Sequence, residues 1–232
     1  MTTTPRTLTV TECHQLLNTL VPEKSTHKQH LKAIRNYAMA LLMLDAGLRV
    51  GEVVSLTQQD LTYPTPPISS VTLQPHQTKN KKERTIPLSS RLQAALDEMD
   101  KKWWWPTGRL LHYYAFYRTD PRTPITTRQV ERIIRRAALK CIGRPIHPHV
   151  LRHTFASRLM RKVNIRIVQE LLGHTRMSST QIYTHPSQDD LKDAIAQLGV
   201  GDIETELWPM PLASGPDSAN RTDTPDTNSN VR

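Results

Sequence analysis

The feature that most constrains the fold is a pair of predicted helices on either side of a glycine, between residues 31 and 56. Over residues 31–46, apolar side chains recur with a helical period and form a wide apolar face. Gly47 is placed to end this helix, because glycine readily adopts the left-handed conformation that follows many helices. Apolar residues at 50, 53, 54 and 56 restart a helical pattern at once. Arg49 therefore lies on a tight corner, where its side chain can be held in one direction.

The rest of the chain predicts an α+β domain that is mainly α-helical and has one small antiparallel sheet. Extended runs at 71–73 and 84–88 flank a basic segment, which is typical of a β-hairpin with a basic tip. Further helices are expected over residues 11–18, 89–99, 126–142, 148–160 and 167–172, around Tyr183, and over 188–198. Residues 103–125 are aromatic and interrupted by proline, and no element is assigned to them.

The distribution of charge favours a polyanionic partner. The chain has a net charge of +10. The last 32 residues contain six of the 21 acidic residues but only two of the 31 basic ones, so the first 200 residues carry 29 basic against 15 acidic side chains, a net charge of +14. A field of this sign favours nucleic acid, although a merely basic surface gives the same count.

The chain-wide composition also sets the expected compartment and layout. Cys13 and Cys141 are the only cysteines and form no CxxC motif, which fits a reducing cytoplasm and implies neither a disulfide framework nor a thiolate metal site. The N-terminus has no long apolar core and no run approaches a membrane span, so a cytoplasmic protein without a membrane partner is expected. The layout expected is a tail over 1–5, one domain over 6–198 and a tail over 199–232, disordered from about residue 213.

Four residues able to take part in phosphoryl transfer fall within 35 positions of one another. They are His149, Arg152, His174 and Tyr183. His149 and Arg152 are three apart near the start of a predicted helix, where free backbone N–H groups favour an anion. Tyr183 carries a phenol, which attacks a phosphodiester only if a neighbouring group accepts its proton. Taken singly, each of these residues also fits a structural role.

Two alternatives compete for the same segment, and a third concerns the aromatic residues. A zinc site would use His147, His149, His153 and His174, but no HExxH motif or nearby cysteine supports it. A metal-dependent nuclease needs clustered carboxylates, which the segment lacks. The aromatic residues at 103–105, 113, 114, 116 and 117 could stack on bases, but a core or partner-facing cluster is favoured for so apolar a group.

Four blocks in order resemble the catalytic domain of the tyrosine recombinases, the phage integrase family that includes the Xer-type enzymes. The blocks are AGLRVGEVVSL at 46–56, TKNKKERTIPL at 78–88, PHVLRHTFA at 148–156, and LLGH at 171–174 with TQIYTH at 180–185. The resemblance covers roughly residues 6–198 and makes these residues the catalytic domain. It implies a DNA breaking and rejoining enzyme that needs no cofactor, metal or ATP.

Carried onto this chain, the resemblance implies a role for each matching residue. Arg49 and Arg152 bind the scissile phosphate, and His174 adds a further donor. His149 manages the proton of the attacking phenol, and Tyr183 forms a 3′-phosphotyrosyl link. Lys79 protonates the departing 5′ oxygen; it lacks the usual flanking glycines, and its neighbours Lys81 and Lys82 have phosphate contact as their expected role. Glu52 braces the site.

The resemblance also sets expectations about partners and rival activities. It implies a site-specific recombinase of the integrase, invertase or resolvase type that acts on double-stranded DNA as a homotetramer at two sites, near the nucleoid and with accessory DNA-bending proteins. Residues 188–198 are a candidate for docking onto a neighbour. Only some 45 residues precede the Arg49 block, which is expected either for short forms lacking a full N-terminal DNA-binding domain or for a fragment of a longer protein. A type IB topoisomerase and a catalytically idle DNA-binding relative are the alternatives.

Overall fold

The computed structural model describes residues 6–21, 26–62, 68–108 and 110–173, all within the first of two compact units of the chain. The helix expected around Tyr183, the helix expected over 188–198 and the C-terminal tail lie outside the described residues. Across the described ranges the fold is mainly α-helical with one two-stranded antiparallel sheet, as predicted. No helix in these ranges is both long enough and apolar enough to cross a membrane.

Threonine caps set where several helices begin. Thr9 and Thr26 each form a capping box, with Glu12 and Gln29 respectively, at the start of α1 (Val10–Leu20) and α2 (His27–Asp45). Helix α2 therefore starts about one turn before the predicted residue 31. The Thr26 cap begins the helix there, and the polar residues 27–30 continue it although they lie outside its apolar face. Thr126 forms a third box with Gln129, as predicted, and begins α6 (Thr127–Ile142).

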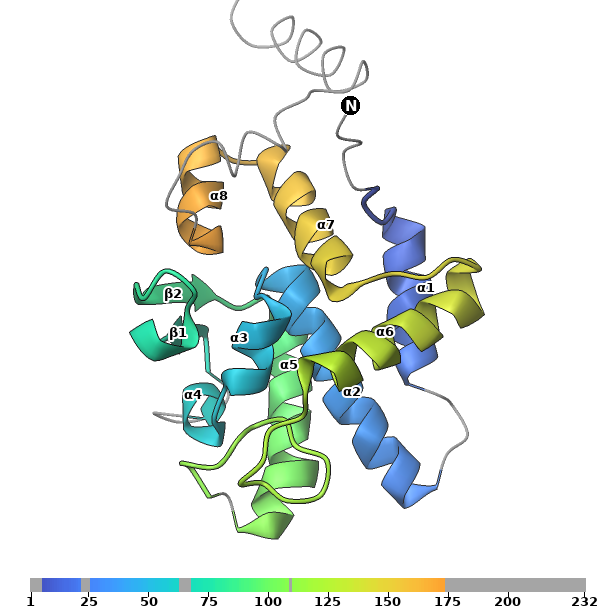
Figure 1. Ribbon diagram of the computed structural model, residues 1–232, viewed down its shortest axis with the longest axis vertical. Coiled ribbons are helices and arrows are strands. Elements are labelled where there is room, and N and C mark those ends of the chain that lie inside the picture. Colours follow the sequence, from blue (N-terminus) through green and yellow to red (C-terminus); the bar gives the residue numbers. More distant parts are fainter. Residues whose placement is uncertain (1–5, 22–25, 63–67, 109, 174–232) are drawn as a thin grey trace, which may run out of the picture. The chain divides into compact units, whose positions relative to one another are not determined.

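Helix α2 is the centre of the hydrophobic core. Every residue from 38 to 44 is buried, so this part of the helix is apolar on all sides and covered all round. It contacts α1, α5 (Ser90–Met99), α6 and α7 (Pro148–Met160), which surround it in Figure 1. Because α2 ends at the Gly47 corner, this packing also fixes the position of the residues that follow.

The corner after α2 has the tight geometry predicted from the sequence. Gly47 has a φ of +63°, and the Leu48 N–H donates to the Leu42 carbonyl at 3.1 Å. Helix α3 (Val50–Ser55) starts immediately afterwards, with Arg49 as its N-cap residue. A Cβ added at Gly47 would overlap the Phe155 ring on α7. The glycine thus lets α7 approach the backbone of the corner closely.

Gly47→Ala is expected to lower the free energy of unfolding by about 2–4 kcal/mol. Alanine is strained in the left-handed backbone conformation, and its Cβ would overlap the Phe155 ring. Gly51→Ala is the matched control, since Gly51 is exposed in α3 and an added Cβ would have no heavy atom within 4 Å. This control is expected to be neutral or stabilising by up to about 1 kcal/mol. Urea denaturation of both variants measures the difference, and equal effects would contradict this account of the corner.

The predicted hairpin is present and places a basic connection at its tip. Strands β1 (Ser70–Leu73) and β2 (Arg84–Pro87) pair antiparallel, with Val71 opposite Ile86 and Leu73 opposite Arg84. Helix α4 (Gln58–Thr62) precedes the hairpin, and the short helix η1 (Pro75–Gln77) begins the connection. Lys79, Lys81 and Lys82 are exposed on that connection.

The aromatic segment left unassigned in the sequence is largely core. Helix α5 continues as η2 (Asp100–Trp104) and η3 (Trp105–Thr107) before an irregular loop. Trp104 and Phe116 are fully buried, and the Trp104 indole N–H donates to the Ala115 carbonyl at 3.0 Å. Base stacking is therefore excluded for these two rings, since a fully buried ring has no face open to a base. Of the three tryptophans at 103–105, only Trp105 is largely exposed.

Helices α6 and α8 (Ile165–Leu172) both end at glycines, as predicted. Gly143 follows α6 and Gly173 follows α8, both in the left-handed conformation. Pro148 lies in the first turn of α7, where its missing N–H costs nothing. Helix α8 contacts both α7 and β2, and Figure 1 shows it on the same side as the hairpin. The end of α8 is thereby brought close to the start of β2.

Candidate functional site

One carboxylate lies where four parts of the fold come together. These parts are the corner after α2, the start of β2, the first turns of α7 and the end of α8. This carboxylate belongs to Glu52, in the first turn of α3. Its side chain is 3% exposed and lies within 4 Å of three guanidinium groups. These groups come from Arg49, Arg84 and Arg152, which are far apart in the sequence.

Glu52 binds two of the three arginines by direct hydrogen bonds. Both of its oxygens accept from the Arg84 guanidinium, at 3.0 and 2.7 Å, in a bidentate pair. Its oxygens also accept from the Arg49 side chain at 2.8 Å and from the Arg49 backbone N–H at 2.7 Å. The nearest Arg152 nitrogen is 3.8 Å away. One carboxylate thus hydrogen-bonds two of the cations and lies near the third, an arrangement consistent with the bracing role expected of Glu52.

The charge state of Glu52 follows from this environment. Burial by itself raises the pKa of the carboxyl, but the hydrogen bonds and positive charge of Arg84, the Arg49 backbone N–H and the charge of Arg152 outweigh it, so the pKa is lowered from 4.5. Glu52 is therefore ionised at neutral pH. It leaves the cluster with a net charge of about +2, which suits an anionic ligand.

Arg152 connects three elements through its buried guanidinium. It donates to the Gly47 carbonyl and, at 2.7 Å, to the Leu172 carbonyl, and its side chain is 6% exposed. These bonds join α7 to the corner after α2 and to the end of α8. The guanidinium is held rigidly, and a rigid donor loses little entropy on binding a ligand.

Arg49 is the most accessible of the three arginines. Its side chain is 25% exposed, compared with 7% for Arg84 and 6% for Arg152. As the N-cap residue of α3 it is fixed at its backbone by Glu52, while part of its side chain meets solvent. This is the arrangement expected of a residue that is positioned by the protein and can also contact a bound phosphate.

Lys79 lies on the exposed hairpin connection, next to a residue that ties the connection to α8. The Asn80 side-chain amide donates to the Gly173 carbonyl at 3.2 Å. Gly173 immediately precedes His174, so the connection bearing Lys79 is held beside the point where the chain continues to His174. The other two predicted site residues, His174 and Tyr183, lie outside the described residues.

The two histidines of α7 differ in environment. His149 is exposed in the first turn, while His153 is partly buried one turn later. Burial lowers the pKa of His153, and the nearby His149 and Arg152 lower it further, which favours a neutral ring. His147 lies 2.8 Å from Glu131. Among the described residues, no group of three or more His, Cys, Asp or Glu side chains is placed to hold a metal.

The sequence prediction assigned no role to Arg84, which the structure places at the centre of the site. One signal pointed to it. In β2, burial alternates so that Arg84 shares the inward face with Ile86. An arginine on the buried face of a strand needs an acidic partner, and Glu52 is that partner.

Known proteins are similar to this chain over most of its length. A model of the phage integrase family matches residues 6–189. A tyrosine recombinase of Pseudothermotoga lettingae is 38% identical over 170 residues, covering 72% of this chain and 55% of that protein. Tyrosine recombinase XerA of Pyrococcus furiosus is 31% identical over 199 residues, covering 85% of this chain and 63% of that protein. The chain belongs to the phage integrase family.

Solved structures support the same fold. The crystal structure of a XerA recombinase superposes with a TM-score of 0.64 at 27% identity, covering 84% of this chain and 66% of that chain. A XerH site-specific recombinase bound to a palindromic difH substrate has a TM-score of 0.64 at 22% identity and so is evidence for the fold alone. The chain spans roughly half to two thirds of the length of these proteins.

Proposed function

We propose that this protein is a site-specific DNA recombinase that cleaves and rejoins DNA strands through a covalent 3′-phosphotyrosyl intermediate, without metal or ATP. The observation that carries the proposal is the cluster of Arg49 and Arg152 around the buried carboxylate of Glu52. Membership of the phage integrase family and the names of its relatives, which are tyrosine recombinases, support the same conclusion.

In this proposal Arg49 and Arg152 bind the scissile phosphate. The guanidinium group stays charged and offers planar pairs of N–H donors that match phosphate oxygens. Negative charge accumulates on the phosphoryl oxygens as the phosphorus becomes pentacoordinate, and donors fixed in advance stabilise it without reorganising. Because Glu52 fixes Arg49, and two carbonyls fix Arg152, both donors are arranged before DNA arrives.

The remaining residues carry the nucleophile and the protons. The phenol oxygen of Tyr183 forms a bond to phosphorus, and the bond from phosphorus to the 5′ oxygen breaks. His149 accepts the phenol proton, Lys79 supplies a proton to the departing 5′ oxygen, and His174 donates to the phosphate. His149 and Lys79 are both exposed, which is consistent with access to a bound strand.

The intermediate explains why no energy source is needed. The phosphotyrosyl bond replaces a phosphodiester bond, so the phosphoryl group remains activated for a second transfer. A 5′-hydroxyl from another strand then attacks the phosphorus and releases Tyr183. The atoms balance, with one phosphorus–oxygen bond formed and one broken at each transfer.

The proposed partner is double-stranded DNA, bound by four copies of the chain at two sites, with accessory DNA-bending proteins and a place in the cytoplasm near the nucleoid. The net charge of the first 200 residues favours DNA. Two family structures, a XerH recombinase and a Tn1549 transposon integrase, were solved in complex with DNA. Residues 188–198 are proposed to dock onto a neighbouring copy.

A nicked suicide substrate tests the proposal. A library of duplexes with a randomised central segment and a nick is incubated with the full chain in EDTA, and adducts that survive denaturation are recovered and sequenced. We expect adducts that share one sequence, with the protein joined to a 3′ phosphate. Cleavage that requires added metal, or the complete absence of adducts, would contradict the proposal.

The recovered sequence then separates a recombinase from a type IB topoisomerase. Two duplexes that carry this sequence and different end labels are mixed with the protein. A recombinase yields products that join both labels, because it exchanges strands between sites. A topoisomerase only reseals the original strand, and a passive DNA-binding protein forms no adduct at all.

A further inference from the structure

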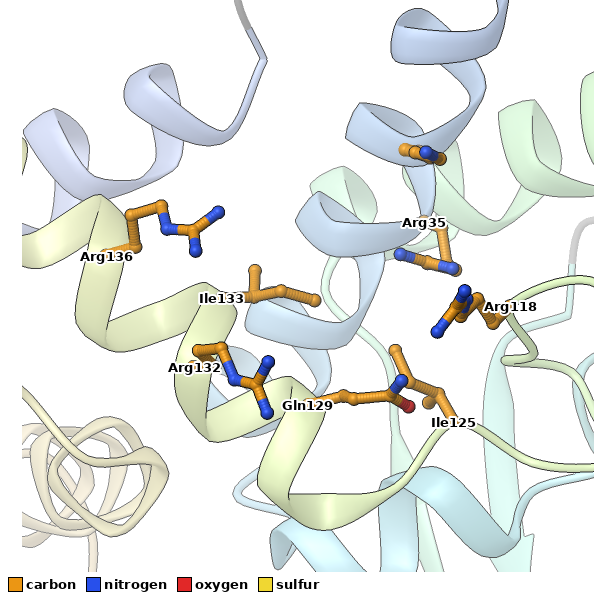
Figure 2. Close-up of a pocket in the computed structure, with 8 residues that line it drawn as sticks. Arg35, Arg118, Ile125, Gln129, Arg132, Ile133 and Arg136 are labelled. Carbon is orange, nitrogen blue, oxygen red and sulfur yellow. The ribbon is translucent and has the colours of Figure 1, made fainter.

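A second cationic feature lies away from the Glu52 cluster, in a pocket between α2 and α6. The pocket has a cavity of about 330 Å³ and is closed on one side by the irregular loop before α6. Figure 2 shows Arg132 and Gln129 projecting from α6, with Arg35 on α2 and Arg118 on the loop. Three separate segments therefore build the pocket, and the helix packing fixes two of them.

Among the described residues, the pocket lining is cationic and contains no acid. Its polar lining consists of Lys32, Arg35, Arg118, Arg132, Arg136 and one amide, Gln129. Within the described ranges, none of the five cations forms an ion pair with an aspartate or glutamate. No described carboxylate therefore offsets their mutual repulsion, and a bound anion would relieve it.

Arg35 distinguishes this pocket from an ordinary basic surface. It is only 5% exposed, and its guanidinium donates to neutral acceptors, the Tyr117 carbonyl at 2.7 Å and the Asn36 side-chain oxygen at 3.0 Å. It also lies 5.7 Å from the centre of the Trp103 ring. Burial lowers the pKa of Arg35 to about 10, so the group remains charged at neutral pH at a cost in desolvation.

A buried charge of this kind is normally compensated by a counter-ion. The described part of the chain supplies none, while the cavity beside Arg35 is large enough for a ligand. Arginine predominates in the lining, and the planar guanidinium group offers pairs of N–H donors that match the oxygens of a phosphate or a carboxylate. The number of cations also favours a ligand with repeated negative charges.

We infer that this pocket binds a phosphate group of the DNA backbone, apart from the phosphate held at Arg49 and Arg152. This inference rests on the proposed function, since it takes DNA as the ligand. A backbone contact carries no sequence information, but it positions the duplex and adds affinity that depends on salt. The pocket thus contributes to positioning the duplex rather than to cleavage.

Duplex binding by a double variant, Arg118→Gln with Arg132→Gln, tests the inference. Both side chains are exposed, so the fold should tolerate the changes. We expect affinity for a random-sequence duplex to fall by roughly tenfold and the slope of log affinity against log salt to shrink by about 1–2. The matched control replaces Arg128 and Arg135, two exposed arginines of α6 outside the pocket lining, with glutamine.

Thermal unfolding in inorganic phosphate distinguishes two possible ligands of the pocket, a phosphate of the DNA backbone and a free phosphate compound. At constant ionic strength, phosphate above its dissociation constant should raise the Tm of the wild type by about 3 °C or more, and should not raise that of the pocket variant. In phosphate-free buffer the pocket variant should be no less stable than the wild type, because it has lost like charges. A phosphate effect without a change in the duplex salt slope would assign the pocket to a free phosphate compound.

Besides assignment of the pocket to a free phosphate compound, two outcomes would overturn the inference. One is an equal loss of duplex affinity in the pocket variant and the control variant, which would mean diffuse attraction by the whole surface. The other is an unchanged salt slope together with no response to phosphate. Neither affects the proposed function, because adduct formation by Tyr183 is measured separately with the suicide substrate at low salt.

Discussion

Phenylalanine in place of Tyr183 is expected to abolish the covalent protein–DNA adduct while leaving duplex affinity within about twofold. The substitution removes only the oxygen that forms the bond to phosphorus, so binding through the basic surface should persist. Loss of a covalent nucleophile costs on the order of 10⁶ in other enzymes, and a drop of at least about 10⁴ in the rate of adduct formation is expected here. The nicked substrate and fluorescence anisotropy provide the two measurements.

The matched control is Tyr113→Phe. Tyr113 is partly buried, and its hydroxyl accepts from Arg122 at 3.3 Å in the loop before α6, away from the Glu52 cluster. Adduct formation by this variant should equal that of the wild type. If Tyr183→Phe still formed adduct at the wild-type rate, another residue would be the nucleophile, and mapping the DNA-linked peptide would identify it.

Glu52→Gln is expected to have the largest effect on stability. The substitution keeps the size of the side chain but removes the negative charge shared by Arg49, Arg84 and Arg152. Removing one partner from a buried ion pair costs about 3–5 kcal/mol, because the remaining charge is left buried without compensation. For a domain of this size the Tm should fall by about 10 °C. The rate of adduct formation should fall by about 10²-fold, since Arg49 loses its anchor.

The pH dependence of stability provides a second readout for the same variant. Because the pKa of Glu52 is lowered in the folded protein, its contribution is present in full above about pH 4.5, the value for the unfolded chain. It is lost as the pH falls through the lower folded value. The difference in stability between wild type and Glu52→Gln should therefore shrink as the pH drops below 4.5.

Glu131→Gln is the control for this experiment. Glu131 also contacts a basic residue, His147, but its side chain is 45% exposed, and exposed pairs contribute about 1 kcal/mol or less. If Glu52→Gln were no more destabilising than Glu131→Gln, the three arginines would not depend on a common carboxylate. In that case the bracing role of Glu52 would have to be abandoned.

Much of the local structure could be predicted, because it depends on residues close together in the sequence. The helix ends at Gly47, Gly143 and Gly173 follow from glycine's access to positive φ, and all three have it. The hairpin follows from two short extended runs. The start of α2 was misplaced by about one turn, because the cap formed by Thr26 and Gln29 extends a helix beyond its apolar pattern.

The aromatic segment shows where such reasoning stops. Trp104, Phe116 and Tyr117 have no helical or alternating period, so the sequence alone left their element unassigned. In the structure they are buried, and Tyr117 offers its backbone carbonyl to Arg35, which is 82 residues away. Their position depends on which surfaces remain uncovered after the helices have packed.

By itself the sequence determined the family and the residue types of the proposed site, because those are carried by short motifs around Arg49, Lys79, Arg152 and Tyr183. Only the tertiary structure decided that Glu52 pairs with Arg84 across 32 residues and that Arg152 reaches carbonyls on two other elements. It also left Arg35 buried beside a pocket whose described lining residues include no acid. The physical reason is that a charge's surroundings are set by packing between distant segments, and no local pattern of residues specifies which charges become buried together.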